Sequence, residues 1–278
     1  MSRQTAVGLE RVRLLRYGGD TCESVEDQVA LEEPLEIRIA GEAMAITMRT
    51  PGHDPELVLG FLLAEGVIRS AAEVGGIAHC GKPGESGNVI DVTAAPGTVI
   101  DWESEGPARR SLLVSSACGV CGRRSIDDLL ARTGTIDDDS RFSAAWVRGL
   151  TRELSPRQHN FASSGGVHAA GLWSAERELY VLREDVGRHN AVDKVVGRLA
   201  LDGRLPARGT ALVVSGRASF EIVQKATVAR IPLLVSVSAP SSLAIAAAAR
   251  SGMTLVGFAR GERFNVYSGA ERIACAES

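Results

Sequence analysis

Residues 210–258 read TALVVSGRASFEIVQKATVARIPLLVSVSAPSSLAIAAAARSGMTLVGF. Three short apolar runs alternate here with two stretches in which apolar residues recur every three or four positions. Such runs predict strands, and the recurring spacing predicts helices. Leu212–Val214 and Leu233–Val237 are almost free of polar residues, as in strands that are covered on both faces. The stretch therefore predicts an α/β domain with a largely parallel sheet.

The alternating pattern extends back to residue 111. It predicts helices over Ser143–Leu154 and Asn190–Ala200, and a strand pair at Gly166–Trp173 and Leu179–Arg183. The first 110 residues contain mostly short β-rich runs. A chain of 278 residues, 45% of them hydrophobic, is long enough for two cores. We therefore predict a small, strand-rich α+β domain over residues 1–110 and an α/β domain over residues 111–278.

One helix interrupts the strands of the first part. Asp54 suits its N-cap, Pro55 suits its first helical position, and Gly66 suits its end. The polar segment Thr98–Arg110 contains glycine and proline, and we interpret it as a linker to the second part.

Polar loops follow the predicted strands, at the edge of the sheet where α/β proteins bind ligands. Ser215–Ser219 and Ser238–Ser242 each lead into a helix, and helix N-termini bind phosphate readily. Arg260 and Arg263 follow the last strand and flank a glycine, which suits a phosphate clamp. Phe258 or Phe264 beside them is able to stack on a base. These loops predict a nucleotide site.

A pair of cysteines lies in the stretch SSACGVCGRR, residues 115–124. A strand-like run precedes the pair and a helix-like pattern follows it, so the pair falls near a helix start. The helix dipole and the charges of Arg123 and Arg124 favour a thiolate there. We therefore interpret Cys118 and Cys121 as a reactive pair in a loop.

Four interpretations of this pair compete. Structural zinc needs about four ligands, and the sequence holds no second Cys or His pair at related spacing. A thioredoxin-like disulfide exchanger suits the strand, turn and helix order but leaves the anion-binding loops unexplained. In sulfur transfer, one cysteine accepts a sulfane sulfur as a persulfide and passes it on. In the fourth interpretation the cysteines are inert and buried, but the serine, glycine and arginine residues beside them do not favour burial.

Two histidines are candidates for ligand contacts, although a lone histidine is more often structural. The run GGVHAA, residues 165–170, is faintly similar to the His-x-Glu of zinc deaminases, with His168 as its histidine. Ala170 stands where the catalytic Glu of a deaminase would be. Deaminase chemistry therefore lacks its acid–base group in this chain. His189, beside Arg188 and before a predicted helix, is the better candidate.

Bulk composition excludes several function classes. A formal net charge of −3 disfavours a nucleic-acid coat or a polybasic membrane surface. The most apolar long stretch, Ile231–Ala249, contains two prolines and several serines and does not suit a membrane span. The N-terminus shows no apolar signal region, and the three remaining cysteines are isolated. We therefore expect a protein of the reducing cytoplasm.

Five segments resemble the FdhD family, the formate dehydrogenase accessory sulfurtransferases. They are ACGVCG (117–122), GGVHAA (165–170), REDVGRHNAVDK (183–194), SGRASFE (215–221) and GFARGER (257–263). They occur in order along most of the chain, and the run over residues 183–194 is hard to match by chance.

The resemblance implies a cytidine-deaminase-like, three-layer C-terminal domain behind the smaller N-terminal one, often in a homodimer. It implies a sulfurtransferase that takes sulfur from a cysteine desulfurase and gives it to Mo-bis(molybdopterin guanine dinucleotide), bis-MGD, before formate dehydrogenase becomes active. Cys118 would carry the persulfide, and Cys121 would assist. No structural metal is expected.

The resemblance also implies a cofactor-binding stretch. Its members are Phe258, Ala259, Arg260, Gly261, Glu262 and Arg263. We add Gly216, Arg217 and His189 from the neighbouring loops as expected contacts to the guanine and phosphates.

Two other functions remain open at this point. The first is a chaperone that shelters the guanylated cofactor, with the cysteines in a regulatory function. The second is a zinc-bound nucleotide hydrolase. A gain of one sulfur atom on the peptide with the cysteine pair, after exposure to desulfurase and cysteine, would separate a carrier from a chaperone.

Overall fold

The stretch over residues 210–258 forms alternating strands and helices, as predicted, and it lies at the centre of the fold. In the structure, a computed structural model that describes residues 8–81, 87–102 and 134–274, this stretch forms three strands and two helices. They are β10 (Thr210–Val214), α6 (Phe220–Val228), β11 (Leu233–Ser236), α7 (Ser242–Ser251) and β12 (Thr254–Arg260). The three strands pair in parallel, and a helix makes each return connection.

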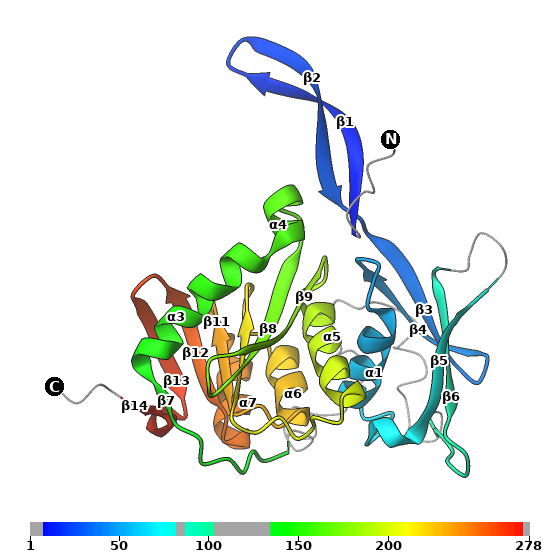
Figure 1. The fold of residues 1–278 in the computed structure, drawn as a ribbon, viewed down its shortest axis with the longest axis vertical. Coiled ribbons are helices and arrows are strands. Elements are labelled where there is room, and N and C mark those ends of the chain that lie inside the picture. The colour runs from blue at the N-terminus through cyan, green and yellow to red at the C-terminus, as the bar shows by residue number, and fades with distance from the viewer. Residues whose placement is uncertain (1–7, 82–86, 103–133, 275–278) are drawn as a thin grey trace.

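These strands belong to a six-stranded sheet with the order β13-β12-β11-β10-β8-β9 (Figure 1). The flanking strands are β8 (His168–Ser174), β9 (Leu179–Asp185) and β13 (Arg263–Ser268). They join by antiparallel pairing. The prediction of a largely parallel sheet is therefore wrong at both flanks, because hairpins join β8 to β9 and β12 to β13, and hairpins require antiparallel neighbours.

Helices cover both faces of this sheet (Figure 1). Side chains alternate along each strand, so Leu212 and Val214 belong to one core and Val213 to the other. The first core packs on α5 (Arg188–Leu201), α6 and α7, and the second packs on α3 (Ala144–Leu154). The sheet is thus the middle one of three layers.

The N-terminal part contains a second sheet with the order β4-β3-β6-β5. Its strands are β3 (Glu33–Ile39), β4 (Glu42–Arg49), β5 (Val74–Cys80) and β6 (Val89–Ala94). Helix α1 (Asp54–Glu65) lies between this sheet and α5 (Figure 1). The β-rich runs predicted in this part therefore form strands.

Helix α1 begins differently from the prediction. Asp54 is the first helical residue, and the cap residue is His53, with φ 59° and no side-chain capping hydrogen bond. The N-cap prediction is wrong because Arg49 binds the Asp54 carboxylate, with Nε–Oδ1 at 3.1 Å and Nη2–Oδ2 at 3.2 Å. Pro55 consequently stands one position further into the helix than predicted. Gly66, with φ 72°, ends α1 as predicted.

Helices α1 and α5 approach closely because each presents a glycine to the backbone of the other. A Cβ at Gly197 would overlap the carbonyl oxygen of Glu56, and a Cβ at Gly60 would overlap that of Asp193. One apolar core consequently runs from β3 through α1 and α5 to β10. The boundary predicted between residues 110 and 111 lies outside the described residues, so the division into two domains stays a prediction.

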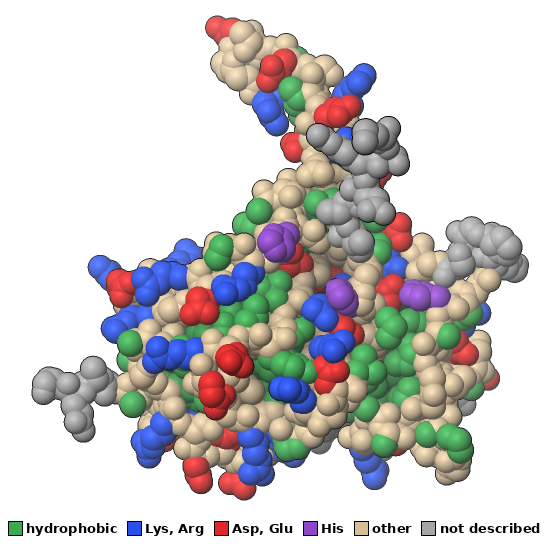
Figure 2. Space-filling view, viewed as in Figure 1, with side chains coloured by type: hydrophobic (Ala, Val, Ile, Leu, Met, Phe, Trp, Pro, Cys, Tyr) green, Lys and Arg blue, Asp and Glu red, His purple; other side chains and the backbone are tan. Residues whose placement is uncertain are grey.

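An antiparallel ribbon of β1 (Leu9–Gly18) and β2 (Thr21–Ala30) projects from the body (Figure 1). The sequence predicts only Gln28–Leu31 as a strand in this region. Most ribbon residues are exposed on both faces, so their sequence lacks the apolar alternation of a half-buried strand. Basic and acidic side chains are mixed over the ribbon and over the body in the face drawn in Figure 2.

Shorter elements complete the described chain. They are η1 (Ala71–Glu73), β7 (Phe142–Ser143), η3 (Ser155–Arg157), α4 (His159–Ser164), η4 (Ala270–Arg272) and β14 (Ile273–Ala274). Among the described residues, no helix is long and apolar enough to cross a membrane.

Candidate functional site

The loops that follow the strands meet at one edge of the six-stranded sheet. Strands β9 to β12 all end at this edge, and antiparallel β8 begins there, with His168 paired to Asp185. The edge therefore gathers His168, Ser215, Val237 and Arg260 from the ends of four different strands, at the side of the sheet where α/β proteins bind ligands.

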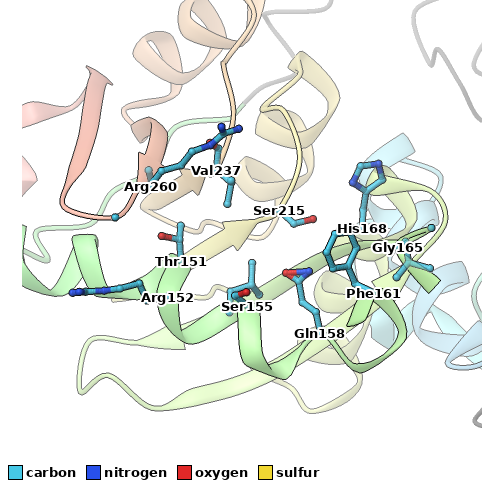
Figure 3. Close-up of a pocket in the computed structure, with 15 residues that line it drawn as sticks. Thr151, Arg152, Ser155, Gln158, Phe161, Gly165, His168, Ser215, Val237 and Arg260 are labelled. Carbon is cyan, nitrogen blue, oxygen red and sulfur yellow. The ribbon is translucent and has the colours of Figure 1, made fainter. Parts of the chain in front are cut away.

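A cavity of about 560 Å³ opens at this edge, on the face of the sheet that α3 covers (Figure 3). Small-molecule sites commonly have volumes in this range. One wall comes from the end of α3, from η3 and from α4, and the other comes from the sheet edge. Polar and aromatic residues of the two walls are Thr151, Arg152, Ser155, Gln158 and Phe161 on the first, and His168, Ser215 and Arg260 on the second.

Hydrogen bonds at the starts of its two helices, α3 and α4, hold the first wall in place. Ser143 Oγ accepts the N–H of Trp146 at 3.2 Å at the start of α3, whose buried face packs on the sheet. At α4, the Glu184 carboxylate of β9 accepts the N–H groups of Asn160 and Phe161, both at 2.9 Å. A carboxylate from the sheet thus fixes the short helix that closes the cavity.

Gln158 is a buried polar residue of this wall. It is 6% exposed, and its carboxamide makes no hydrogen bond to any described residue. In Figure 3 the carboxamide points into the cavity. The amide oxygen and nitrogen are therefore available to water or to a ligand in the cavity.

His168 belongs to the opposite wall. Burial lowers the pKa of His168 below its ordinary 6.5, and the nearby Arg188 guanidinium lowers this pKa further. The imidazole is therefore neutral at neutral pH and offers one donor and one acceptor. Arg188 itself has a buried Nε that finds no hydrogen-bond partner in the described part of the chain.

Two arginines, Arg152 of α3 and Arg260 at the end of β12, line another side of the cavity (Figure 3). Arg260 Nε donates to the carbonyl oxygen of Val237 at 2.9 Å. Glu262 in the turn lies 2.8 Å from Arg152 Nη1 and 3.8 Å from Arg148 Nε of α3. Exposed pairs of this kind contribute at most about 1 kcal/mol each, but they orient the turn toward α3. The cavity thus has a cationic side and a neutral side.

Comparison with known proteins identifies the family. A profile of the FdhD/NarQ family matches residues 30–274. The chain belongs to the FdhD/NarQ family. A protein from Anaeromyxobacter sp. (strain K), named sulfur carrier protein FdhD, is 51% identical over 268 residues, which cover 94% of this chain and 92% of the relative. A Streptomyces avermitilis protein of the same name is 47% identical over 272 residues and 95% of each chain.

A solved structure is similar as well. The crystal structure of a protein from Desulfotalea psychrophila, described as a formate dehydrogenase accessory protein, matches with a TM-score of 0.75 at 29% identity. The match covers 96% of this chain and 99% of that chain.

Residues 258–263, the stretch that the family resemblance implies for cofactor binding, lie partly in the cavity wall. Three of its residues line the cavity: Ala259, Arg260 and Gly261. Phe258 is 46% exposed, with φ 52°, and its N–H donates to the carbonyl oxygen of Ser238. Glu262 is bound to α3, and Arg263 faces Arg260 across the hairpin as its strand partner. The phosphate clamp stays a prediction.

Gly216 and Arg217 lie beside this wall, toward α5 and α6. A Cβ at Gly216 would lie 3.4 Å from His168 Nδ1 and 3.7 Å from Arg188 Cδ. Arg217 is exposed. Gly216 therefore leaves the backbone bare between the cavity and Arg188.

His189 is mainly engaged with its own surroundings. Its Nε2 lies 3.0 Å from Ser219 Oγ and 3.8 Å from a Glu221 carboxylate oxygen. Burial and the charge of Arg188 lower the pKa of His189 to about 4. His189 is thus a neutral, hydrogen-bonded residue next to the cavity, and its contact with a cofactor stays a prediction.

The run over residues 183–194 joins the two sheets. Asp185 accepts from Lys194 Nζ at 2.7 Å and from the Thr50 N–H at 3.2 Å, and Lys194 also donates to the Thr50 carbonyl oxygen at 2.8 Å. Asn190 Nδ2 donates to the Met48 carbonyl oxygen at 2.8 Å. This buried network binds the end of β4 to the start of α5, and so it positions the edge loops.

Cys118 and Cys121 lie outside the described residues, so their position relative to the cavity stays a prediction. Within the described residues, no group of three or more His, Cys, Asp or Glu side chains lies close enough to hold a metal ion. The sequence did not indicate Gln158 or Phe161, because a polar residue before a short helix and an aromatic residue within it form no recognisable pattern. The sequence did indicate Ser215, because this residue opens a predicted edge loop.

Proposed function

We propose that the protein is a sulfur carrier that loads sulfur on Cys118 and delivers it to bis-MGD for formate dehydrogenase. The observation that carries the proposal is the cavity at the sheet edge, with Arg260 and Gly261 in its wall. Relatives about half identical over most of the chain are named sulfur carrier proteins, and the similar crystal structure is described as a formate dehydrogenase accessory protein.

Loading moves one sulfur atom between cysteines. The Cys118 thiolate attacks the outer sulfur of a persulfide on a cysteine desulfurase. A new S–S bond forms on Cys118, the S–S bond of the donor breaks, and the donor cysteine leaves as a thiolate. The charges of Arg123 and Arg124, together with the helix start that the sequence predicts there, favour the attacking thiolate.

Delivery requires that the sulfur leave as sulfide. The Cys121 thiolate attacks Sγ of Cys118, a disulfide forms between the two cysteines, and the outer sulfur departs with two electrons. That sulfide becomes a ligand of molybdenum. A thiol reductant then returns the pair to its starting state.

The protein holds the substrate while this happens. Arg260 presents its guanidinium at the cationic side of the cavity, and charge-assisted hydrogen bonds to phosphate contribute about 1.5–3 kcal/mol each. Gly261 leaves the backbone of the turn bare for close approach, with φ 58°. Positioning of a docked substrate supplies most of the rate advantage, because the transfer itself needs no acid–base residue.

The scaffold and the assembly complete the proposal. A cytidine-deaminase-like C-terminal domain is supported by the antiparallel strand β8 beside the three parallel strands β10, β11 and β12, in a three-layer arrangement. Ala170 at the deaminase Glu position agrees with lost deaminase chemistry. A homodimer is supported by the ribbon, where Leu15 and Tyr17 are 60% and 74% exposed.

Labelling with radioactive sulfur tests the carrier function. The purified protein is incubated with a cysteine desulfurase and [35S]cysteine, separated without reductant, and compared with Cys118→Ala and Cys80→Ala. We expect label on the wild type and on Cys80→Ala, which removes a partly exposed free cysteine of β5. We expect at most background label on Cys118→Ala, because the attacking thiolate is gone.

Undiminished labelling of Cys118→Ala would remove Cys118 from its function. The second candidate is a cofactor chaperone, which needs only the cavity, and the described residues of the cavity wall include no cysteine. A Cys118→Ala protein that still activates formate dehydrogenase in cells would support this chaperone.

A further inference from the structure

The neutral side of the cavity holds a hydrogen-bonding group that sulfur transfer does not use. The backbone of Gln158 is fixed, because its N–H donates to Ser155 at 3.3 Å and its carbonyl oxygen accepts from Ala162 at 2.9 Å. Its carboxamide, in a residue only 6% exposed, has no partner among the described residues and points into the cavity (Figure 3). A carboxamide that faces a cavity and has no partner among the described residues is complementary to a ligand with its own donor and acceptor.

The neighbours of Gln158 define which ligand fits. Ser215 Oγ already accepts the Ala169 N–H at 2.9 Å, so its hydroxyl proton is free to be donated. His168 is neutral, and the ring of Phe161 stands between Gln158 and His168 in Figure 3. A wall of amide, hydroxyl, imidazole and phenyl groups suits an uncharged, flat heterocycle rather than a phosphate.

We propose that the Gln158 carboxamide binds the amino-oxo edge of a fused pyrimidine ring, the edge that guanine and pterin share. Oε1 accepts the ring N–H, Nε2 donates to the ring oxygen, and Phe161 stacks on the ring face. This inference rests on the proposed function, whose substrate contains both kinds of ring.

The arrangement of charges agrees with this orientation. Figure 3 places Arg152 and Arg260 apart from Gln158 and Phe161, at the β12–β13 side of the cavity. A nucleotide with its base at Gln158 therefore directs its phosphates toward the arginines. The hydrogen bonds of the base orient the ligand, and the cations hold its charged part.

Calorimetric titration of three proteins with three ligands tests the inference. The proteins are the wild type, Gln158→Leu and Gln224→Leu, and the ligands are GDP, 1-methyl-GDP and 6-hydroxymethylpterin. Gln224 is a matched control: it is 7% exposed, but its Nε2 already donates to the Ala64 carbonyl oxygen at 3.0 Å. Thermal unfolding of each ligand-free protein and sulfur labelling of Cys118 accompany the titrations.

We expect Gln158→Leu to weaken binding of GDP or of the pterin about tenfold and to leave the unfolding midpoint unchanged or higher, because no protein hydrogen bond is lost. Gln224→Leu lowers the midpoint and leaves both affinities unchanged. If guanine is the occupant, the wild type also binds 1-methyl-GDP, which lacks the ring N–H, about tenfold more weakly than GDP, and Gln158→Leu loses this preference.

A loss confined to GDP assigns the site to guanine, and a loss confined to the pterin assigns it to the pterin. Unchanged affinities in Gln158→Leu, no binding of either ligand to the wild type, or a lowered midpoint of Gln158→Leu would overturn the inference. Sulfur labelling reports on the proposed function separately, since loading of Cys118 does not require an occupied cavity.

Discussion

At the scale of single residues, the Glu56 carboxylate joins the two parts of the molecule. It stands on α1 and binds Arg183 of β9 through two hydrogen bonds, at 2.6 and 2.7 Å. Burial alone would raise the pKa of Glu56, but the hydrogen bonds from Arg183 and His53 outweigh it and lower this pKa from 4.5 to about 2. The folded protein therefore binds a proton at Glu56 more weakly than the unfolded chain does.

This difference predicts a pH-dependent stability. A lowered carboxylate pKa contributes stability that is fully present above pH 4.5 and is lost as the pH falls toward 2. We expect Glu56→Gln to lower the free energy of unfolding by about 2 kcal/mol at pH 7, after allowance for solvent screening, and by less at pH 3.5. Urea unfolding at both pH values measures the two differences.

Glu262→Gln is the matched control, since Glu262 also pairs with arginines but its side chain is 69% exposed. Its effect on stability stays below about 1 kcal/mol at both pH values. A loss for Glu56→Gln that is equal at pH 7 and pH 3.5 would contradict the lowered pKa.

At the scale of elements, the contact between α1 and α5 depends on two residues without side chains. Gly60 and Gly197 each face the backbone of the other helix, and a Cβ at either position would overlap a carbonyl oxygen. Intrinsic helix propensity favours alanine over glycine by about 1 kcal/mol. Here packing decides against propensity, because the whole helix would have to move to admit one methyl group.

We expect Gly197→Ala to lower the free energy of unfolding by about 2 kcal/mol or more. Gly149→Ala in α3 is the control: its Cβ would meet only the end of the Glu153 side chain, at 4.0 Å. That exchange should leave stability unchanged or raise it by up to about 1 kcal/mol. Denaturant unfolding of both variants measures the contrast, and a stabilised Gly197→Ala would refute the close contact.

At the scale of the whole molecule, the two sheets share one apolar core. It includes Leu35 and Ile37 of β3, Leu57 and Leu62 of α1, and Leu212 of β10. The buried network of Asp185, Lys194 and Thr50 crosses the same junction, and breaking such a network is costly. The two sheets should therefore open together.

Hydrogen exchange measured by mass spectrometry tests this cooperativity. We expect peptides from β3 and from β11 to exchange through openings of the same free energy, and that energy should equal the global free energy of unfolding. The β1–β2 ribbon serves as an internal reference, because an exposed two-stranded ribbon opens readily. An opening of β3 at clearly lower energy than β11 would instead support two independent domains.

The sequence by itself determined what depends on neighbouring residues. The alternation over residues 210–258, the end of α1 at Gly66 and the loops of the sheet edge all follow from local spacing, and local spacing sets helix and strand periods. The chemistry proposed for Cys118 likewise rests on the residues beside it.

Only the tertiary structure decided which distant residues meet. Arg49 binds Asp54 across a turn, and the glycines of α1 and α5 bring these two distant helices into contact. The cavity likewise places Gln158 opposite Ser215, which is far from it along the chain. No local period encodes such contacts, because they arise when helices and sheets pack to bury apolar surface, and packing then fixes which polar groups are left facing the cavity.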